Sequence, residues 1–78
     1  MIYIATFYTH AAALLTHRAL TKNGIEAVMQ PVPRALSSSC GTCVRYAADD
    51  PCFPILDRDA EQVAECTTDG YRVIRRFD

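Results

Sequence analysis

Residues 2–30, IYIATFYTHAAALLTHRALTKNGIEAVMQ, predict a strand, a helix and a second strand. Ile2 to Phe7 are apolar or β-branched on both faces of an extended chain, which is typical of a central strand. Thr9 can cap a helix from His10 to Asn23, because the apolar residues of that segment recur at the spacing of one buried helical face. Ile25 to Gln30 then alternate apolar and polar side chains and predict a second strand.

The second half of the chain predicts a strand, a helix and a last strand. Thr42 to Ala48 form an alternating run that we expect to pair antiparallel with the preceding strand through a long hairpin. Asp57 or Asp59 can cap a helix that ends at Gly70. Four residues of this segment share a helical face: Ala60, Val63, Ala64 and Thr67. Tyr71 to Phe77 alternate again as the last strand.

The order strand-helix-strand-strand-helix-strand predicts an α+β fold of the ferredoxin-like βαββαβ type. Such a fold is a four-stranded antiparallel sheet with two helices on one face and the other face open. At 78 residues the chain is expected to be one domain, 1–78. In this layout Tyr8, Thr9 and His10 lie near Cys40, whereas Cys52 lies at the opposite end of the sheet.

Composition excludes several classes of protein. The formal net charge is −1 and half of the residues are apolar, as in an ordinary globular domain and unlike a strong non-specific nucleic-acid binder. The apolar stretch at residues 1–8 is too short to span a bilayer, and no basic region or cleavage site marks an export signal. We therefore expect a cytoplasmic protein, in which four cysteines serve chemistry, metal binding or packing.

Cys40 is the leading candidate for a functional residue. It lies near the end of the run PVPRALSSSCGTC, Pro31 to Cys43, in which a proline-set approach leads to a turn of small residues. Backbone amides close to a sulfur can lower the pKa of a thiol and hold an anion. We expect the amides of Ser39, Gly41 and Thr42 to form such an anion-binding nest.

Positive groups elsewhere in the chain are the expected activators of this thiol. The guanidinium groups of Arg34 and Arg45 are candidates, with Arg34 closing over the nest. The N-terminus of the first helix, with Thr9 and His10, adds a partial positive charge at the same end of the predicted sheet. These residues complete the expected anion- or persulfide-binding set.

The remaining cysteines admit other interpretations. A zinc site of all four is disfavoured, because Cys52 would lie roughly 25 Å from Cys40 along a strand that rises about 3.3 Å per residue. Cys66, at the margin of the second predicted helix, is expected to be a small buried apolar residue. Cys43 forms a CxxC pair with Cys40, and is expected either to resolve a disulfide or to lie on the open sheet face.

Several segments together resemble the small DUF3343 domain, a selenium- or sulfur-carrier-like family. The resemblance covers nearly the whole chain and rests on these segments: Thr9-His10-Ala11-Ala12, Gly24-Ile25, Pro31-Val32-Pro33-Arg34 and Ser38-Ser39-Cys40-Gly41. It implies that Cys40 is the family's cysteine, with Gly41 beside it and Pro33, Arg34 and Ser39 before it. The chain departs from the family pattern at Cys43, where small apolar residues are usual, and this makes a dithiol an alternative.

The resemblance implies a carrier, in which Cys40 accepts sulfur or selenium as a persulfide or selenosulfide and passes it to a partner. Its partners would be donor and acceptor proteins, without nucleic acid or membrane. No Ser-His-Asp set, catalytic carboxylate pair or phosphate-binding glycine loop is visible, so we expect no cofactor, no metal and no independent turnover.

Two alternatives stay open. In one, Cys40 and Cys43 form a small thiol-disulfide redox module. In the other, the protein is a non-enzymatic binding or regulatory domain that uses its open sheet face, on which Arg45, Arg72 and Arg76 are expected to point outward. In a variant of this second alternative, the same face is a homodimer interface.

Overall fold

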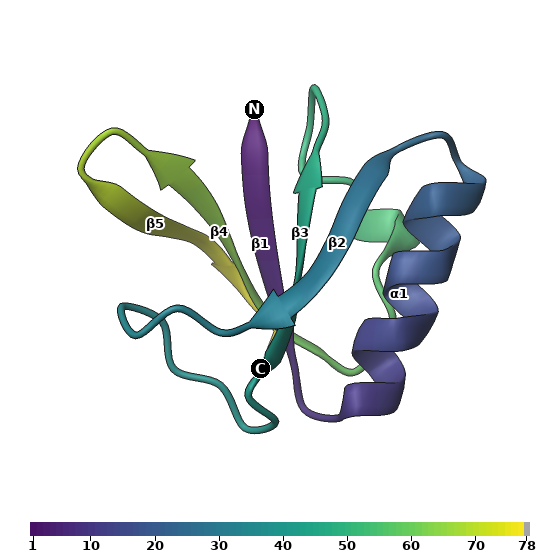
Figure 1. Ribbon diagram of the computed structural model, residues 1–78, viewed down its shortest axis with the longest axis horizontal. Coiled ribbons are helices and arrows are strands. Elements are labelled where there is room, and N and C mark those ends of the chain that lie inside the picture. The colour runs from purple at the N-terminus through teal and green to yellow at the C-terminus, as the bar shows by residue number, and fades with distance from the viewer. Residues whose placement is uncertain (78) are drawn as a thin grey trace.

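The computed structural model describes residues 1–77 and has the α+β architecture expected from the sequence. Its elements are β1 (Ile2–Phe7), α1 (His10–Lys22), β2 (Glu26–Pro31), β3 (Thr42–Ala47), a 3-10 turn η1 (Phe53–Ile55), β4 (Ala60–Thr67) and β5 (Gly70–Arg76). The strands form a single sheet in the order β2-β3-β1-β4-β5, and every neighbouring pair is antiparallel (Figure 1).

The first four elements follow the predicted pattern closely. β1 lies between β3 and β4, and its residues from Tyr3 to Phe7 are buried, as expected for a central strand. Thr9 caps α1, because its hydroxyl accepts a hydrogen bond from the backbone N of Ala12 at 3.1 Å. Gly24, at φ +76°, turns the chain from the end of α1 into β2.

The predicted second helix is wrong, because its residues form the strand β4. Ala, Glu and Gln favour helices, and the apolar residues of this segment happen to recur at helical spacing. In the folded chain, however, β4 pairs with β1 on one side and β5 on the other, and Gln62, Val63 and Ala64 are buried in succession. Pairing on both edges and burial on both faces override the local helix preference.

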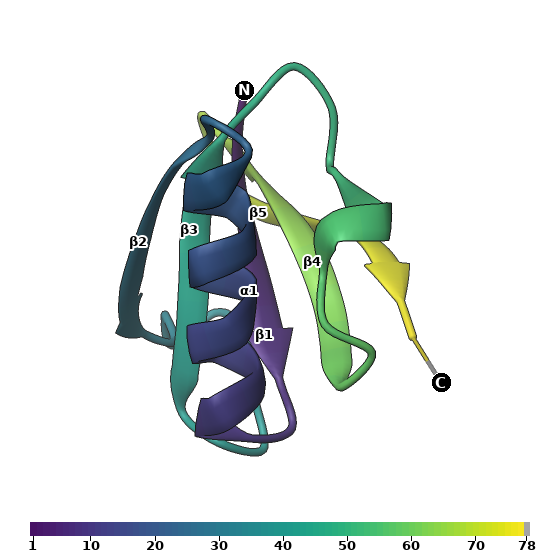
Figure 2. The same ribbon diagram turned by 90° about the vertical axis from the view of Figure 1, so that its right-hand side faces the viewer.

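Residues 1–77 therefore form one α-helix and five strands, not two helices and four strands. The first four strands still take the order expected for a ferredoxin-like sheet, with β4 beside β1. Residues 48–59 make the crossover from β3 to β4 with only η1 in place of a helix, on the same face as α1 (Figure 2). The residues predicted to form the last strand lie in and just after β5, which adds a fifth strand at the edge.

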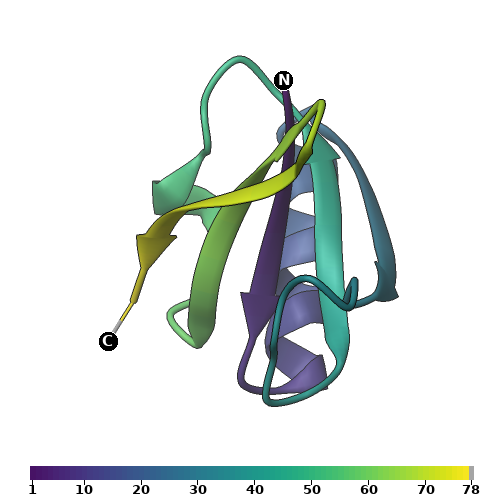
Figure 3. The same cartoon turned by 90° about the vertical axis from the view of Figure 1, so that its left-hand side faces the viewer.

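The sheet separates two apolar clusters. The larger lies under α1 and η1 and contains Tyr3, Ala5, Phe7, Ala12, Ala13, Leu20, Val44, Tyr46, Ala60 and Val63. The smaller lies on the opposite face and contains Ile4, Leu36, Cys43 and Ala64. The face expected to be open is therefore partly covered, because the segment between β2 and β3 crosses the ends of β1 and β3 (Figure 3). Leu36 anchors that segment with 8% of its surface exposed.

Candidate functional site

Residues 32–41, which we call the Cys40 loop, connect β2 to β3 and are held at several points. The backbone N of Val32 donates to the carbonyl of Gly41 at 3.0 Å and closes the base of the loop. Gly41 has φ +73°, a conformation that favours glycine. The hydroxyl of Ser38 donates to the carbonyl of Phe7 at 3.3 Å, which ties the loop to the end of β1.

Cys40 lies half-buried near the end of this loop. Its Sγ donates to the carbonyl oxygen of Thr42 at 3.4 Å, and the hydroxyl of Thr42 lies 3.4 Å from Nδ1 of His10. Because His10 is the first residue of α1, this contact brings the N-terminus of the helix and the Cys40 loop together at one end of the sheet (Figures 1 and 2). The first turn of α1 holds no acidic residue. Thr9 is also at this end, where its hydroxyl is engaged as the helix cap.

Cys43 is fully buried on the sheet face opposite α1, in the cluster that includes Leu36 and Ile4. Its Sγ donates to the carbonyl oxygen of Pro31 at 3.6 Å. Burial raises the pKa of the Cys43 thiol to about 11, although a hydrogen bond with Gln30 opposes the rise. Near neutral pH this thiol is protonated and out of contact with solvent.

The other two cysteines lie away from the loop. Cys52 follows β3 at the far end of the sheet and has φ 57°. Its backbone N donates a hydrogen bond to Oδ1 of Asp50 at 2.7 Å. Burial, together with Asp50, raises the pKa of the Cys52 thiol. Cys66 lies half-buried on β4 against the smaller cluster, not on a helix. Within residues 1–77, no group of three or more His, Cys, Asp or Glu side chains is placed to hold a metal ion.

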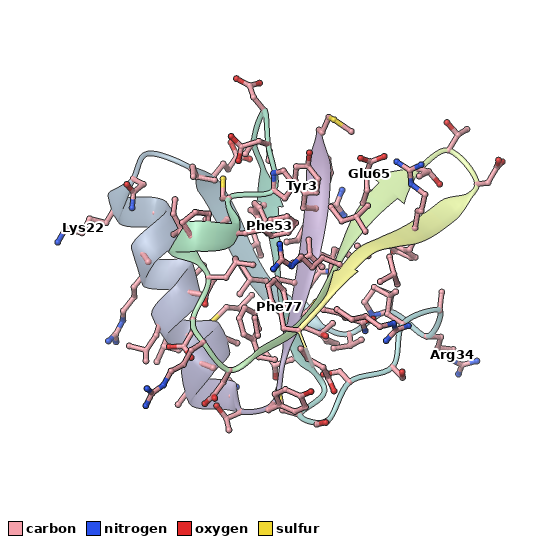
Figure 4. All side chains as sticks on the ribbon, turned by 180° about the vertical axis from the view of Figure 1, so that it is seen from behind. Tyr3, Lys22, Arg34, Phe53, Glu65 and Phe77 are labelled. Carbon is pink, nitrogen blue, oxygen red and sulfur yellow. The ribbon has the colours of Figure 1, made fainter. Side chains whose placement is uncertain are left out.

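Both arginines expected to activate Cys40 are exposed. Arg34 is exposed and points away from the sheet into solvent (Figure 4). Arg45 is exposed on β3 and lines a shallow hollow with Ile2 and Val28, at the end of β3 remote from the loop. The hydrogen-bond partner of the Cys40 Sγ is the carbonyl oxygen of Thr42, and activation of Cys40 by either arginine stays a prediction.

The expectation that three arginines share one sheet face is wrong. Arg45 pairs with Ile4, and Arg76 pairs with Gln62, so both lie on the face opposite α1. Arg72 pairs instead with Glu65, which lies on the α1 side, and its Nη2 contacts Oε1 of Glu65 at 3.2 Å. The register between β4 and β5 shifts at a β-bulge between Val63 and Ala64. Because this shift lies between the positions of Arg72 and Arg76, the two side chains point to opposite faces of the sheet.

Sequence reasoning missed two residues of β4 that contact the Cys40 loop. Nε2 of Gln62 donates to the carbonyl oxygen of Ser37 at 2.7 Å. The carboxylate of Glu61 accepts hydrogen bonds from the backbone N and the hydroxyl of Ser39, at 3.3 Å and 2.9 Å. These contacts could not be predicted while residues 60–67 were expected to form a helix, because they require β4 to lie beside β1.

Comparison with protein families finds a match over the first two thirds of the chain. The family model described as "Putative Se/S carrier protein-like" matches residues 2–52, which run from β1 to the start of the crossover and include the Cys40 loop. No curated protein and no solved structure matches the chain. Among residues 1–77, no helix is long and apolar enough to cross a membrane.

Proposed function

We propose, since the chain belongs to the Se/S carrier protein-like family, that it carries sulfur or selenium on Cys40 and passes the atom from a donor protein to an acceptor protein. The supporting observation is the position of Cys40. This thiol is half-buried on a loop fixed by hydrogen bonds, beside the N-terminus of α1. A carrier thiol must be reachable by two partners and still shield its cargo, and a fixed, half-buried loop position meets both needs.

The proposed transfer requires no cofactor. The Cys40 thiolate attacks the terminal sulfur of a donor persulfide, a bond forms between the two sulfurs, and the donor leaves as a thiolate. The proton of the terminal sulfur stays with it or passes to water, so Cys40 now holds a persulfide. An acceptor thiolate then attacks the same terminal sulfur and releases Cys40 as a thiolate. A selenium atom follows the same steps as a selenosulfide.

The N-terminus of α1 favours an anionic cargo on Cys40. The N-terminus of a helix carries a partial positive charge, and the first turn of α1 holds no acidic residue that would cancel it. His10 extends from that turn to Thr42, two residues beyond Cys40. The terminal atom of a persulfide is readily ionised, so it would be stabilised by these groups.

The burial of Cys43 favours the single-thiol carrier over the dithiol module. To resolve a disulfide, Cys43 would have to leave its buried position and lose a proton from a thiol with a pKa of about 11. We therefore propose that Cys43 packs beneath the loop while Cys40 reacts. The carrier would act in the cytoplasm, where such thiols stay reduced.

Intact-mass measurement after incubation with a cysteine desulfurase and cysteine tests the proposal. The native protein should gain the mass of one sulfur atom, which a thiol reductant removes, and peptide fragmentation should locate it on Cys40. A Cys66→Ser protein is the matched control and should gain the same adduct. If a Cys40→Ser protein gained the adduct as well, Cys40 would not be the carrier.

A further inference from the structure

Two consecutive residues of β4, Glu61 and Gln62, both reach the Cys40 loop. Successive side chains of a regular strand point to opposite faces, so this is not expected of an unbroken ladder. The register of β4 against β1 shifts here, because Thr6 pairs with Gln62 whereas Phe7 pairs with Ala60. Glu61 is the extra residue of this β-bulge, which turns its side chain towards the loop.

The carboxylate of Glu61 accepts three hydrogen bonds. Oε1 accepts from the hydroxyl of Thr6 at 3.2 Å and from the backbone N of Ser39 at 3.3 Å, and Oε2 accepts from the hydroxyl of Ser39 at 2.9 Å. Thr6 is fully buried, and Glu61 itself is half-buried. A protein carboxylate therefore occupies both donors of the residue that precedes Cys40.

From these contacts we propose that Glu61 is an internal anion that competes with anionic reactants for the donors beside Cys40 and so sets the charge selectivity of this thiol. With Glu61 in place, the Ser39 donors face β4, and a negative charge lies next to the site. An anion that arrives at Cys40 must displace the carboxylate or react without those donors. Under the proposed function, which this part of the inference presupposes, the same competition would favour release of a persulfide to an acceptor.

If Glu61 only fixed the loop through its hydrogen bonds, its negative charge would not be needed. An amide at position 61 could accept from the Ser39 backbone N and donate to its hydroxyl, so Glu61→Gln can retain the hydrogen bonds while it removes the charge. Loop fixation affects all reactants at Cys40 alike. Competition by charge affects anionic reactants more than neutral ones, and this difference separates the two roles.

Alkylation with a matched pair of reagents tests the proposal. Iodoacetate is anionic and iodoacetamide is neutral, and in both reactions the Cys40 thiolate forms a bond to carbon and displaces iodide. The measured quantity is the ratio of the Cys40 rate with iodoacetate to the rate with iodoacetamide, with Cys40 resolved from Cys43 by peptide fragmentation. For Glu61→Gln we expect this ratio to rise by up to about fivefold, the effect of one unit charge at about 4 Å in water.

Glu65→Gln is the control, because Glu65 lies on the same strand and pairs with Arg72, away from the loop. It removes the same charge from the protein and should leave the ratio unchanged. If Glu61→Gln accelerated both reagents equally, or left the ratio at its native value, the competition would be refuted and Glu61 would only fix the loop.

Salt dependence of the native protein provides a second measurement that needs no variant. Added salt screens both the carboxylate and the Cys40 thiolate itself, so the ratio should rise with ionic strength more steeply for Cys40 than for a small neutral thiol such as 2-mercaptoethanol. A ratio that rises no more steeply than that of the small thiol overturns the proposal even if Glu61→Gln fails to fold. Neither alkylation involves a sulfur donor, so these results stand whether or not Cys40 gains a sulfur adduct.

Discussion

Leu36→Ala should uncover Cys43 by releasing the Cys40 loop from the sheet. Leu36 is the buried apolar residue of this loop and lies in one cluster with Cys43, Ile4 and Ala64. Truncation of a buried leucine costs about 2–5 kcal/mol. Because Leu36 lies in a surface loop that can settle into the space left behind, we expect a value at the low end, about 2 kcal/mol.

The substitution should mainly reduce the free energy of docking the loop onto the sheet. Leu36 contacts the smaller cluster only when the loop covers the sheet. At 1.36 kcal/mol per tenfold change, a loss of about 2 kcal/mol increases the open population roughly thirtyfold. Cys43 is fully buried in the closed form, so its labelling by a neutral thiol reagent reports this opening. We expect its labelling rate to rise by up to the same roughly thirtyfold.

The dependence of labelling on urea distinguishes local opening from global unfolding. Loop opening exposes little surface, so labelling of Cys43 in Leu36→Ala should depend weakly on urea. Leu20→Ala is the control, because Leu20 is a fully buried residue of α1, on the other side of the sheet, and its loss weakens the whole fold. There, labelling of Cys43 should follow global unfolding and rise steeply with urea. An equally steep rise in Leu36→Ala would refute the argument that the loop alone covers Cys43.

Three further changes test the local physical arguments. The folded-state pKa of Cys43 is raised from 9.0 to about 11, so the unfolded chain loses this proton first, and the free energy of unfolding should fall as pH rises through this range. Urea titrations over that range should show a shallower fall for Cys43→Ala, and an identical slope would contradict the raised pKa. Gly41→Ala should cost about 1 kcal/mol in urea denaturation, because φ is +73° and an added Cβ meets nothing within 4 Å, so only backbone strain acts. Thr9→Ala should cost about 1 kcal/mol by loss of the bond to the Ala12 backbone N, and an unchanged urea midpoint would show that the cap is not used.

Local sequence pattern predicts the elements whose tertiary position agrees with that pattern. β1 is apolar on both faces, and a strand of that kind is stable only between two neighbours and two layers. α1 has a cap at Thr9, a buried face and a glycine stop, all of which act within the segment itself. The strands β2 and β3 and the loop that carries Cys40 followed from alternation and from Pro31, and their predicted bounds agree with the structure to within a residue or two.

The second half of the fold and the surroundings of Cys40 depend on contacts between distant parts of the chain. Residues 60–67 prefer a helix locally, but β1 needs a partner on its free edge, and pairing there gains more than helix formation could. The bulge that turns Glu61 towards Ser39 exists only once β4 is paired with β1. Burial of Cys43 likewise depends on Leu36 lying across the sheet. The spacing of apolar residues along the chain does not predict which strands become neighbours or which loop covers them. Those contacts join residues that are far apart in the sequence.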